Sequence, residues 1–173
     1  ELGFYPDLIL TNTKHPSNIH SDIKDRCEFA SKLEIETRLI DISNSGASDI
    51  LVTLHGYLRI ISPEVINTGI TIINGHPAPV HLYPELKGKD QQENLFIDKD
   101  KYDRYGVIIH KVTNTLDDGE ILVALDKPND VTSIVDAYTK AKELSKKSWI
   151  LYFKEHYNRL WKLESLEHTL QEK

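Results

Sequence analysis

Residues 71–77 read Thr-Ile-Ile-Asn-Gly-His-Pro, an apolar run followed directly by polar residues. Thr71-Ile72-Ile73 is a short apolar run typical of a buried strand, and it ends at Asn74. Binding sites in open parallel sheets lie beyond the carboxyl ends of the strands. Asn74 and His76 are two residues apart and project from one side if the strand geometry continues. The stretch therefore predicts a polar functional site at the end of a buried strand.

The residues before this stretch alternate between strand-like and helix-like patterns. Strands are expected at 8–11, 37–42 and 49–54, each rich in Leu, Ile or Val. Apolar spacing predicts a helix over 22–33 with Ser21 as its cap, and Ser62-Pro63-Glu64 opens a short second helix. This alternation is typical of a parallel, doubly wound sheet.

The residues after this stretch follow a different pattern. A loop over 77–89 leads into a helix from Asp90 to about Phe96, and strands are expected at 106–112 and 121–125. The turn signal Asp117-Asp118-Gly119 lies between these strands and indicates an antiparallel pair. Two helical stretches follow, from Val131 and over 149–170, and the second is expected to pack back on the sheet. The predicted fold class is α/β: one domain over 1–173, a mostly parallel Rossmann-like sheet with an antiparallel strand pair, and C-terminal helices.

Composition narrows the classes of function. The chain has 173 residues, 39% of them hydrophobic and 28% charged, which fits one globular domain. A net charge of −6 disfavours a broad nucleic-acid interface. No apolar run approaches the roughly 20 residues of a membrane span, and no signal peptide is visible. The single cysteine, Cys27, fits a reducing compartment, so we predict a cytoplasmic protein. The sequence does not indicate an oligomeric state.

The residues around Asn74 suit chemistry that passes through an oxyanion. An amide donor beside an imidazole can stabilise the negative oxygen and move a proton, and a carboxylate would orient the imidazole. Asp117 supplies such a carboxylate from a distant part of the chain. A purely structural role for His76 is the alternative, and a metal site of His55, His76 and His81 lacks convincing ligand spacing. The other histidines are interpreted as surface or packing residues: His15, His20, His110, His156 and His168.

Three motifs resemble the formyltransferase family typified by glycinamide ribonucleotide transformylase. The first is Asn-x-His-Pro at Asn74–Pro77. The second runs from His55 to Pro63 and resembles the family's Gly-Phe-Met-Arg-Ile-Leu-Ser-Pro segment. The third, Val112–Gly119, resembles its Val-Thr-x-x-Leu-Asp-Gly-Gly loop. The resemblance covers about Leu8 to Glu143 and is more specific than any single motif.

The resemblance implies a folate-dependent enzyme of one-carbon metabolism. Its co-substrate would be 10-formyltetrahydrofolate, its acceptor a small-molecule amine, and no metal would be needed. It implies catalytic roles for Asn74, His76 and Asp117. The folate pocket would be lined by Leu58, Arg59, Ile60, Ile61, Ile66, Val112, Thr113, Asn114, Thr115 and Leu116, and the amine would meet Pro77 and Glu143. For Leu58, Ile60 and Ile61 the alternative is ordinary core, and for Glu143 a solvated helix face.

The chain also departs from the family pattern. Gly75 and Ala78 replace residues that are bulkier or hydroxylic there, and Gly75 is expected to loosen the strand end. The family's first strand and Gly-rich phosphate-binding loop should precede Asp7; Glu1-Leu2-Gly3 is interpreted as the tail of a helix, so we expect further residues upstream. Alternatives left open are transfer to methionyl-tRNA or to an amino sugar, hydrolysis of formyltetrahydrofolate, and an inactive folate- or ligand-binding module.

Overall fold

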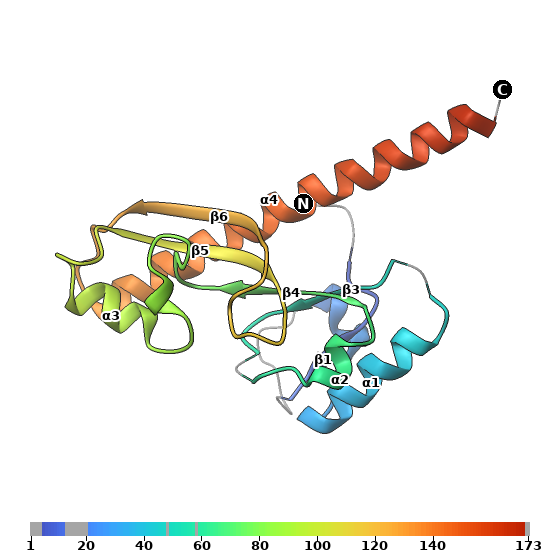
Figure 1. Cartoon of the computed structure of the whole chain (residues 1–173), viewed down its shortest axis with the longest axis horizontal. Coiled ribbons are helices and arrows are strands. Elements are labelled where there is room, and N and C mark those ends of the chain that lie inside the picture. Colours follow the sequence, from blue (N-terminus) through green and yellow to red (C-terminus); the bar gives the residue numbers. More distant parts are fainter. Residues whose placement is uncertain (1–4, 13–20, 48, 58, 172–173) are drawn as a thin grey trace. The chain divides into compact units, whose positions relative to one another are not determined.

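The computed structural model describes residues 5–12, 21–47, 49–57 and 59–171, with side chains as far as His156. The chain divides into two compact units (Figure 1). The first comprises Glu1–Val52 and Arg59–Thr71, and the second comprises Thr53–Leu58 and Ile72–Lys173.

The first unit contains a short parallel strand pair and two helices. β1 (Ile9–Thr11) pairs with β2 (Cys27–Phe29), with Ile9 opposite Cys27. A 3₁₀ helix, η1 (Ser21–Arg26), precedes β2. α1 (Lys32–Asn44) follows it, and α2 (Pro63–Ile66) begins after Ser62 with Pro63 at its first position. The strand expected at 8–11 and the short helix at Pro63 are confirmed.

Two predictions in this unit are wrong. The helix expected over 22–33 is replaced by η1 and β2, and the strand expected over 37–42 lies inside α1. The cause is a capping box: the Ser31 hydroxyl accepts from the Glu34 N–H, and the Glu34 carboxylate accepts from the Ser31 N–H. This pair starts a helix at Lys32. Ile35 and Leu39, four residues apart, then become its buried positions.

The second unit is built on a sheet with the strand order β3-β4-β5-β6. These strands are β3 (Leu51–Leu54), β4 (Thr71–His76), β5 (Arg104–Lys111) and β6 (Ile121–Pro128). β5 and β6 are antiparallel, which confirms the predicted pair, and β4 is also antiparallel to β5. β4 continues to His76, two residues beyond its expected end at Asn74, so Asn74 and His76 both lie within a strand.

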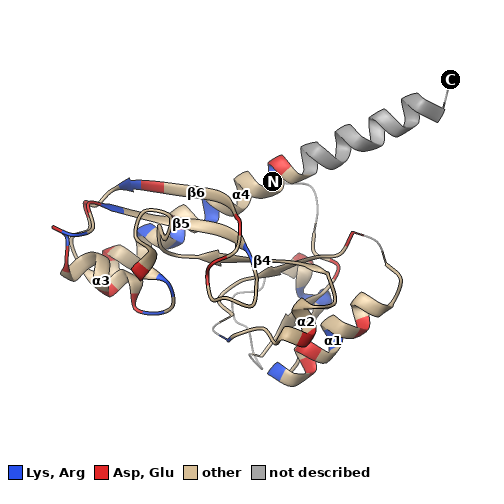
Figure 2. Cartoon of the chain, viewed as in Figure 1, with Lys and Arg blue, Asp and Glu red and all other residues tan. Residues whose placement is uncertain are grey.

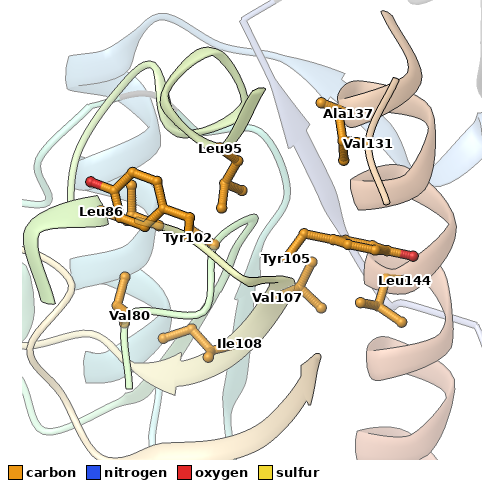
Figure 3. Close-up of a cluster of buried hydrophobic side chains, with 11 residues drawn as sticks. Val80, Leu86, Leu95, Tyr102, Tyr105, Val107, Ile108, Val131, Ala137 and Leu144 are labelled. Carbon is orange, nitrogen blue, oxygen red and sulfur yellow. The ribbon is translucent and has the colours of Figure 1, made fainter. Parts of the chain in front are cut away.

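The helices of this unit cover the sheet and close its core. η2 (Pro84–Leu86) and α3 (Gln91–Ile97) lie between β4 and β5. α4 (Ile134–Gln171) is one continuous helix where two stretches were expected, and it contacts β5 and β6. Its buried positions are Ala137, Ala141, Leu144 and Ser148. Figure 3 shows Leu144 beside Tyr105 and Val107 of β5 in the hydrophobic core.

The fold class is α/β, as predicted, with helices packed on parallel and antiparallel strands. Within the described residues, no helix combines the length and apolar character that crossing a membrane requires.

Candidate active site

The imidazole of His76 and the carboxylate of Asp117 form a buried pair. His76 Nδ1 lies 3.2 Å from Asp117 Oδ2, and the two side chains are 4% and 7% exposed. His76 is the last residue of β4, whereas Asp117 lies in the turn between β5 and β6. Asp117 has a φ of 48°, in the left-handed region that aspartate tolerates better than most residues. The turn therefore presents its carboxylate to the end of β4.

The backbone of the Leu86–Gly88 segment holds this pair from the other side. His76 Nε2 lies 2.9 Å from the carbonyl oxygen of Leu86, and the Gly88 N–H donates to Asp117 Oδ2 at 3.0 Å. A carbonyl oxygen can only accept, so His76 Nε2 carries a hydrogen. Both ring nitrogens of His76 thus face acceptors, an arrangement that suits the protonated imidazole.

Burial opposes the charged form of His76. Removal from water is the largest influence and lowers the pKa of His76, the nearby His110 lowers it too, and Asp117 and the Leu86 carbonyl raise it. For Asp117, burial raises the pKa, but the interactions with His110 and His76 outweigh it, so the pKa falls below its ordinary value of 3.8. The carboxylate is therefore ionised at neutral pH, while burial favours the neutral form of the imidazole.

His110 is a member of this site that the sequence interpretation missed. It is only 2% exposed, and it lies directly opposite Asn74 in the β4–β5 pairing. His110 Nε2 lies 3.5 Å from both Asp117 Oδ1 and Asn74 Nδ2. A surface position is therefore excluded. The available signal was a histidine ending the apolar run Val107-Ile108-Ile109.

The structure thus joins the three predicted catalytic residues into one cluster. Asp117 contacts His76 through one carboxylate oxygen and His110 through the other, and His110 reaches the half-buried Asn74. The cluster offers an amide donor, two imidazoles and an ionised carboxylate. These groups can donate to a developing oxyanion and accept or return a proton.

Charged residues around the cluster are largely paired. Figure 2 shows acidic and basic residues close together at the ends of β5 and β6. Lys87 pairs with Asp118, the residue after Asp117, and Lys111 pairs with Glu120. Among the described residues, no group of three or more His, Cys, Asp or Glu is arranged to hold a metal ion.

The predicted folate-binding residues fall into two groups. Val112–Leu116 form the loop leading to Asp117; the Val112 N–H donates to the Ile72 carbonyl at 2.8 Å, and Leu116 is 53% exposed. The second group lies in the first unit, where Arg59 is exposed and Ile60 is 67% exposed.

The remaining predicted binding residues differ in how deeply they are buried. Ile61 is only 3% exposed and belongs to the core of the first unit, and Ile66 ends α2 half-buried. Pro77 is half-buried directly after His76, and Glu143 is exposed on α4. Leu58, and the Glu1–Gly3 segment interpreted as a helix tail, lie outside the described residues.

The family model and the similar solved structures point to the same protein family. Residues 9–150 match the family model described as formyl transferase. A phosphoribosylglycinamide formyltransferase from Campylobacter jejuni is similar in structure, with a TM-score of 0.67 and 27% identity over 87% of this chain and 79% of that one. The corresponding enzyme from Streptococcus pneumoniae has a TM-score of 0.70 at 20% identity, covering 89% and 88%.

A formyltetrahydrofolate deformylase from Pseudomonas syringae shares the fold at 16% identity, with a TM-score of 0.63, covering 89% of this chain and 52% of that one. Comparison with curated proteins finds no significant match. The family match extends over most of the chain and includes all four residues of the cluster around Asp117. The chain belongs to the formyl transferase family.

Proposed function

We propose that this protein transfers a formyl group from 10-formyltetrahydrofolate to a substrate amine. The observation that carries the proposal is the cluster of Asn74, His76 and Asp117, in which the His76 and Asp117 side chains lie 3.2 Å apart. The cluster lies at the end of β4 and next to the exposed Val112–Leu116 loop. A reacting carbonyl there would meet an amide donor, an imidazole and an ionised carboxylate.

The chemistry follows from these groups. The amine nitrogen attacks the formyl carbon, and the carbonyl oxygen becomes an oxyanion. Asn74 donates a hydrogen bond to this oxygen, and one such donor typically contributes about 2.7–4 kcal/mol. A protonated His76 adds positive charge beside it. The bond from carbon to N10 of the folate then breaks and releases tetrahydrofolate.

A proton must also move during this exchange. The attacking nitrogen loses one proton and N10 gains one, so the reaction is balanced without an outside acid or base. Burial raises the pKa of Asp117, but its interactions with His110 and His76 outweigh burial and lower the pKa, so Asp117 is ionised at neutral pH. With His76 it forms a pair that can accept the proton from the amine and return it to the leaving nitrogen.

The donor and acceptor sites follow from the family resemblance. The folate would contact the backbone of Val112–Leu116. The amine would approach Pro77 and Glu143. Glycinamide ribonucleotide is the acceptor to test first, because the Campylobacter enzyme, at 27% identity, is named for it. An amino sugar and methionyl-tRNA are further acceptors.

Hydrolysis is the second candidate, since water could replace the amine as the nucleophile at the same carbon. The same cluster would stabilise the same oxyanion, so the two reactions differ only in the acceptor. The product distinguishes them: an N-formyl amine for transfer, formate for hydrolysis.

The test uses 10-formyltetrahydrofolate labelled with ¹³C at the formyl carbon. The full-length protein, including any residues that precede Glu1, is incubated with the donor alone and with each acceptor, and products are followed by ¹³C NMR. We expect label in an N-formyl product with one acceptor. Label in formate without any acceptor would favour hydrolysis. Tight binding of 5-formyltetrahydrofolate with no turnover would favour a binding module.

A further inference from the structure

We propose that His110 is a positioning residue for this reaction, whose imidazole orients the Asn74 amide as the oxyanion donor. The inference deepens the proposed formyl transfer and rests on it for the catalytic consequence. The structural link between the residues can be tested without any turnover.

Strand pairing brings His110 to this place. His110 lies directly opposite Asn74 in the antiparallel β4–β5 pair, so the two side chains emerge on the same face of the sheet. The pairing of β5 with β6 shifts register between Ile109 and His110. Such irregularities re-aim a side chain at the end of a strand. Here the imidazole of His110 is buried against the catalytic turn.

Hydrogen bonding assigns a role to each ring nitrogen. His110 Nδ1 lies 2.9 Å from the carbonyl oxygen of Lys111, which can only accept, so Nδ1 carries a hydrogen. In the neutral ring, Nε2 is then an acceptor for Asn74 Nδ2 at 3.5 Å. This contact uses one N–H of the Asn74 amide and fixes which end of the amide faces the reaction. The second N–H remains to donate to the oxyanion.

The two histidines share one carboxylate. His76 Nδ1 faces Asp117 Oδ2, and His110 Nε2 faces Asp117 Oδ1. One negative charge balances one imidazolium, whereas two imidazolium ions in this buried place would leave an unbalanced charge. His110 accepts from Asn74 in the tautomer that carries the hydrogen on Nδ1, where it donates to the Lys111 carbonyl. The charged imidazole and the oriented amide donor then exist together, as the reaction requires.

The other charged groups nearby leave this balance intact. Lys87 is neutralised by Asp118 and Lys111 by Glu120, and both pairs are solvent-facing. The backbone groups on the cluster are the carbonyls of Leu86 and Lys111 and the N–H of Gly88.

Three variants at one position test the role of His110. His110→Gln can present a carbonyl oxygen near the position of Nε2, whereas the shorter side chain of His110→Asn reaches only the position of Nδ1. His110→Leu has no polar group at either position. We expect kcat to fall about 10–100-fold in the Leu and Asn variants, as for small misplacements of catalytic groups. The Gln variant should recover most of the loss, and KM for the folate should stay within about twofold of the wild-type value.

The second readout is independent of activity. Imidazole titration by ¹H–¹⁵N NMR in the free protein, with signals assigned by His76→Gln, should show a higher pKa for His76 in His110→Leu, because the nearby His110 lowers the pKa of His76. If the wild-type protein transfers no formyl group, the proposed function fails, but this titration still tests the interaction of His110 with the cluster. An unchanged His76 pKa, or a Gln variant no faster than Asn, would overturn the inference. If the Leu variant does not fold, the Gln–Asn pair decides.

Discussion

The indole of Trp149 lies against Gly75, the residue between Asn74 and His76 in β4. A β-carbon added at Gly75 would come within 2.9 Å of Trp149 Nε1 and 3.1 Å of its Cζ2. The indole also contacts the ring of His55 at 4.4 Å and stacks on Phe153 at 5.7 Å. Gly75 was expected to loosen the end of β4; instead, an aromatic ring from α4 occupies the space that its missing side chain leaves.

This contact predicts that Gly75→Ala destabilises the protein. The new methyl group must displace an indole that His55 and Phe153 hold, and overpacking of this kind costs about 1–3 kcal/mol. Chemical denaturation measures the loss. The matched background is Trp149→Ala, where the obstruction is gone and Gly75→Ala should be nearly neutral. Equal losses in both backgrounds would mean that Trp149 does not constrain Gly75.

The turn that carries Asp117 depends on Gly119. A β-carbon there would lie 1.8 Å from the carbonyl oxygen of Lys111, which is backbone and cannot move without opening the β5–β6 turn. We expect Gly119→Ala to cost about 3 kcal/mol or more in unfolding free energy. Asp117 should then move away from His76. Glu120→Gln, at the next residue, is the control and should change stability little, since it removes only an exposed ion pair with Lys111.

The site was predictable where short motifs carry the chemistry. Asn74, His76 and Asp117 follow from the motifs and lie in one cluster, although one residue comes from β4 and another from a distant turn. His110 was missed because its role depends on the β4–β5 register, which places it opposite Asn74. Register is a property of paired strands, and a single sequence does not show which residues face each other.

The fold was least predictable at the start of the chain. The Leu39-Ile40-Asp41-Ile42 run resembles a strand because β-branched residues alternate with a polar one. The capping box at Ser31 and Glu34 overrides this local preference by starting α1. In contrast, the turn at Asp117-Asp118-Gly119 correctly predicted an antiparallel pair, because its requirement for glycine and a left-handed aspartate is local.

The buried histidine also makes stability depend on pH. Burial, the largest influence, lowers the pKa of His76 in the folded state below the 6.5 of an unperturbed histidine. The unfolded chain therefore binds more protons, so this contribution is complete above pH 6.5 and is lost as pH falls through the folded pKa. We expect the urea concentration at the midpoint of unfolding to decrease as the pH is lowered below 6.5. His76→Gln should make this decrease smaller.

His55 is the internal control for that experiment. Burial also lowers the pKa of His55, so it contributes an acid-dependent loss of the same sign. His55→Gln should remove its own share and leave that of His76. A wild-type midpoint that stays constant from pH 7 to pH 5 would contradict the assignment for both residues. Asp117 contributes separately and at lower pH. Burial raises its pKa, but the interactions with His110 and His76 outweigh burial and lower the pKa, so this share of the stability is lost only below pH 3.8.

The most direct test of the central claim is a double-mutant cycle on formyl transfer. The single-turnover rate with ¹³C-labelled 10-formyltetrahydrofolate is measured for wild type, His76→Ala, Asp117→Asn and the double variant. Asp118→Asn, the neighbouring carboxylate in the same turn, serves as the control. Because Asp117 acts on the transition state through His76, each single variant should lose roughly 100-fold or more, with little change in folate affinity. The double variant should be little slower than either single, since residues that act as a unit are not additive. Losses that multiply, or an Asp117→Asn protein as fast as wild type, would contradict the account.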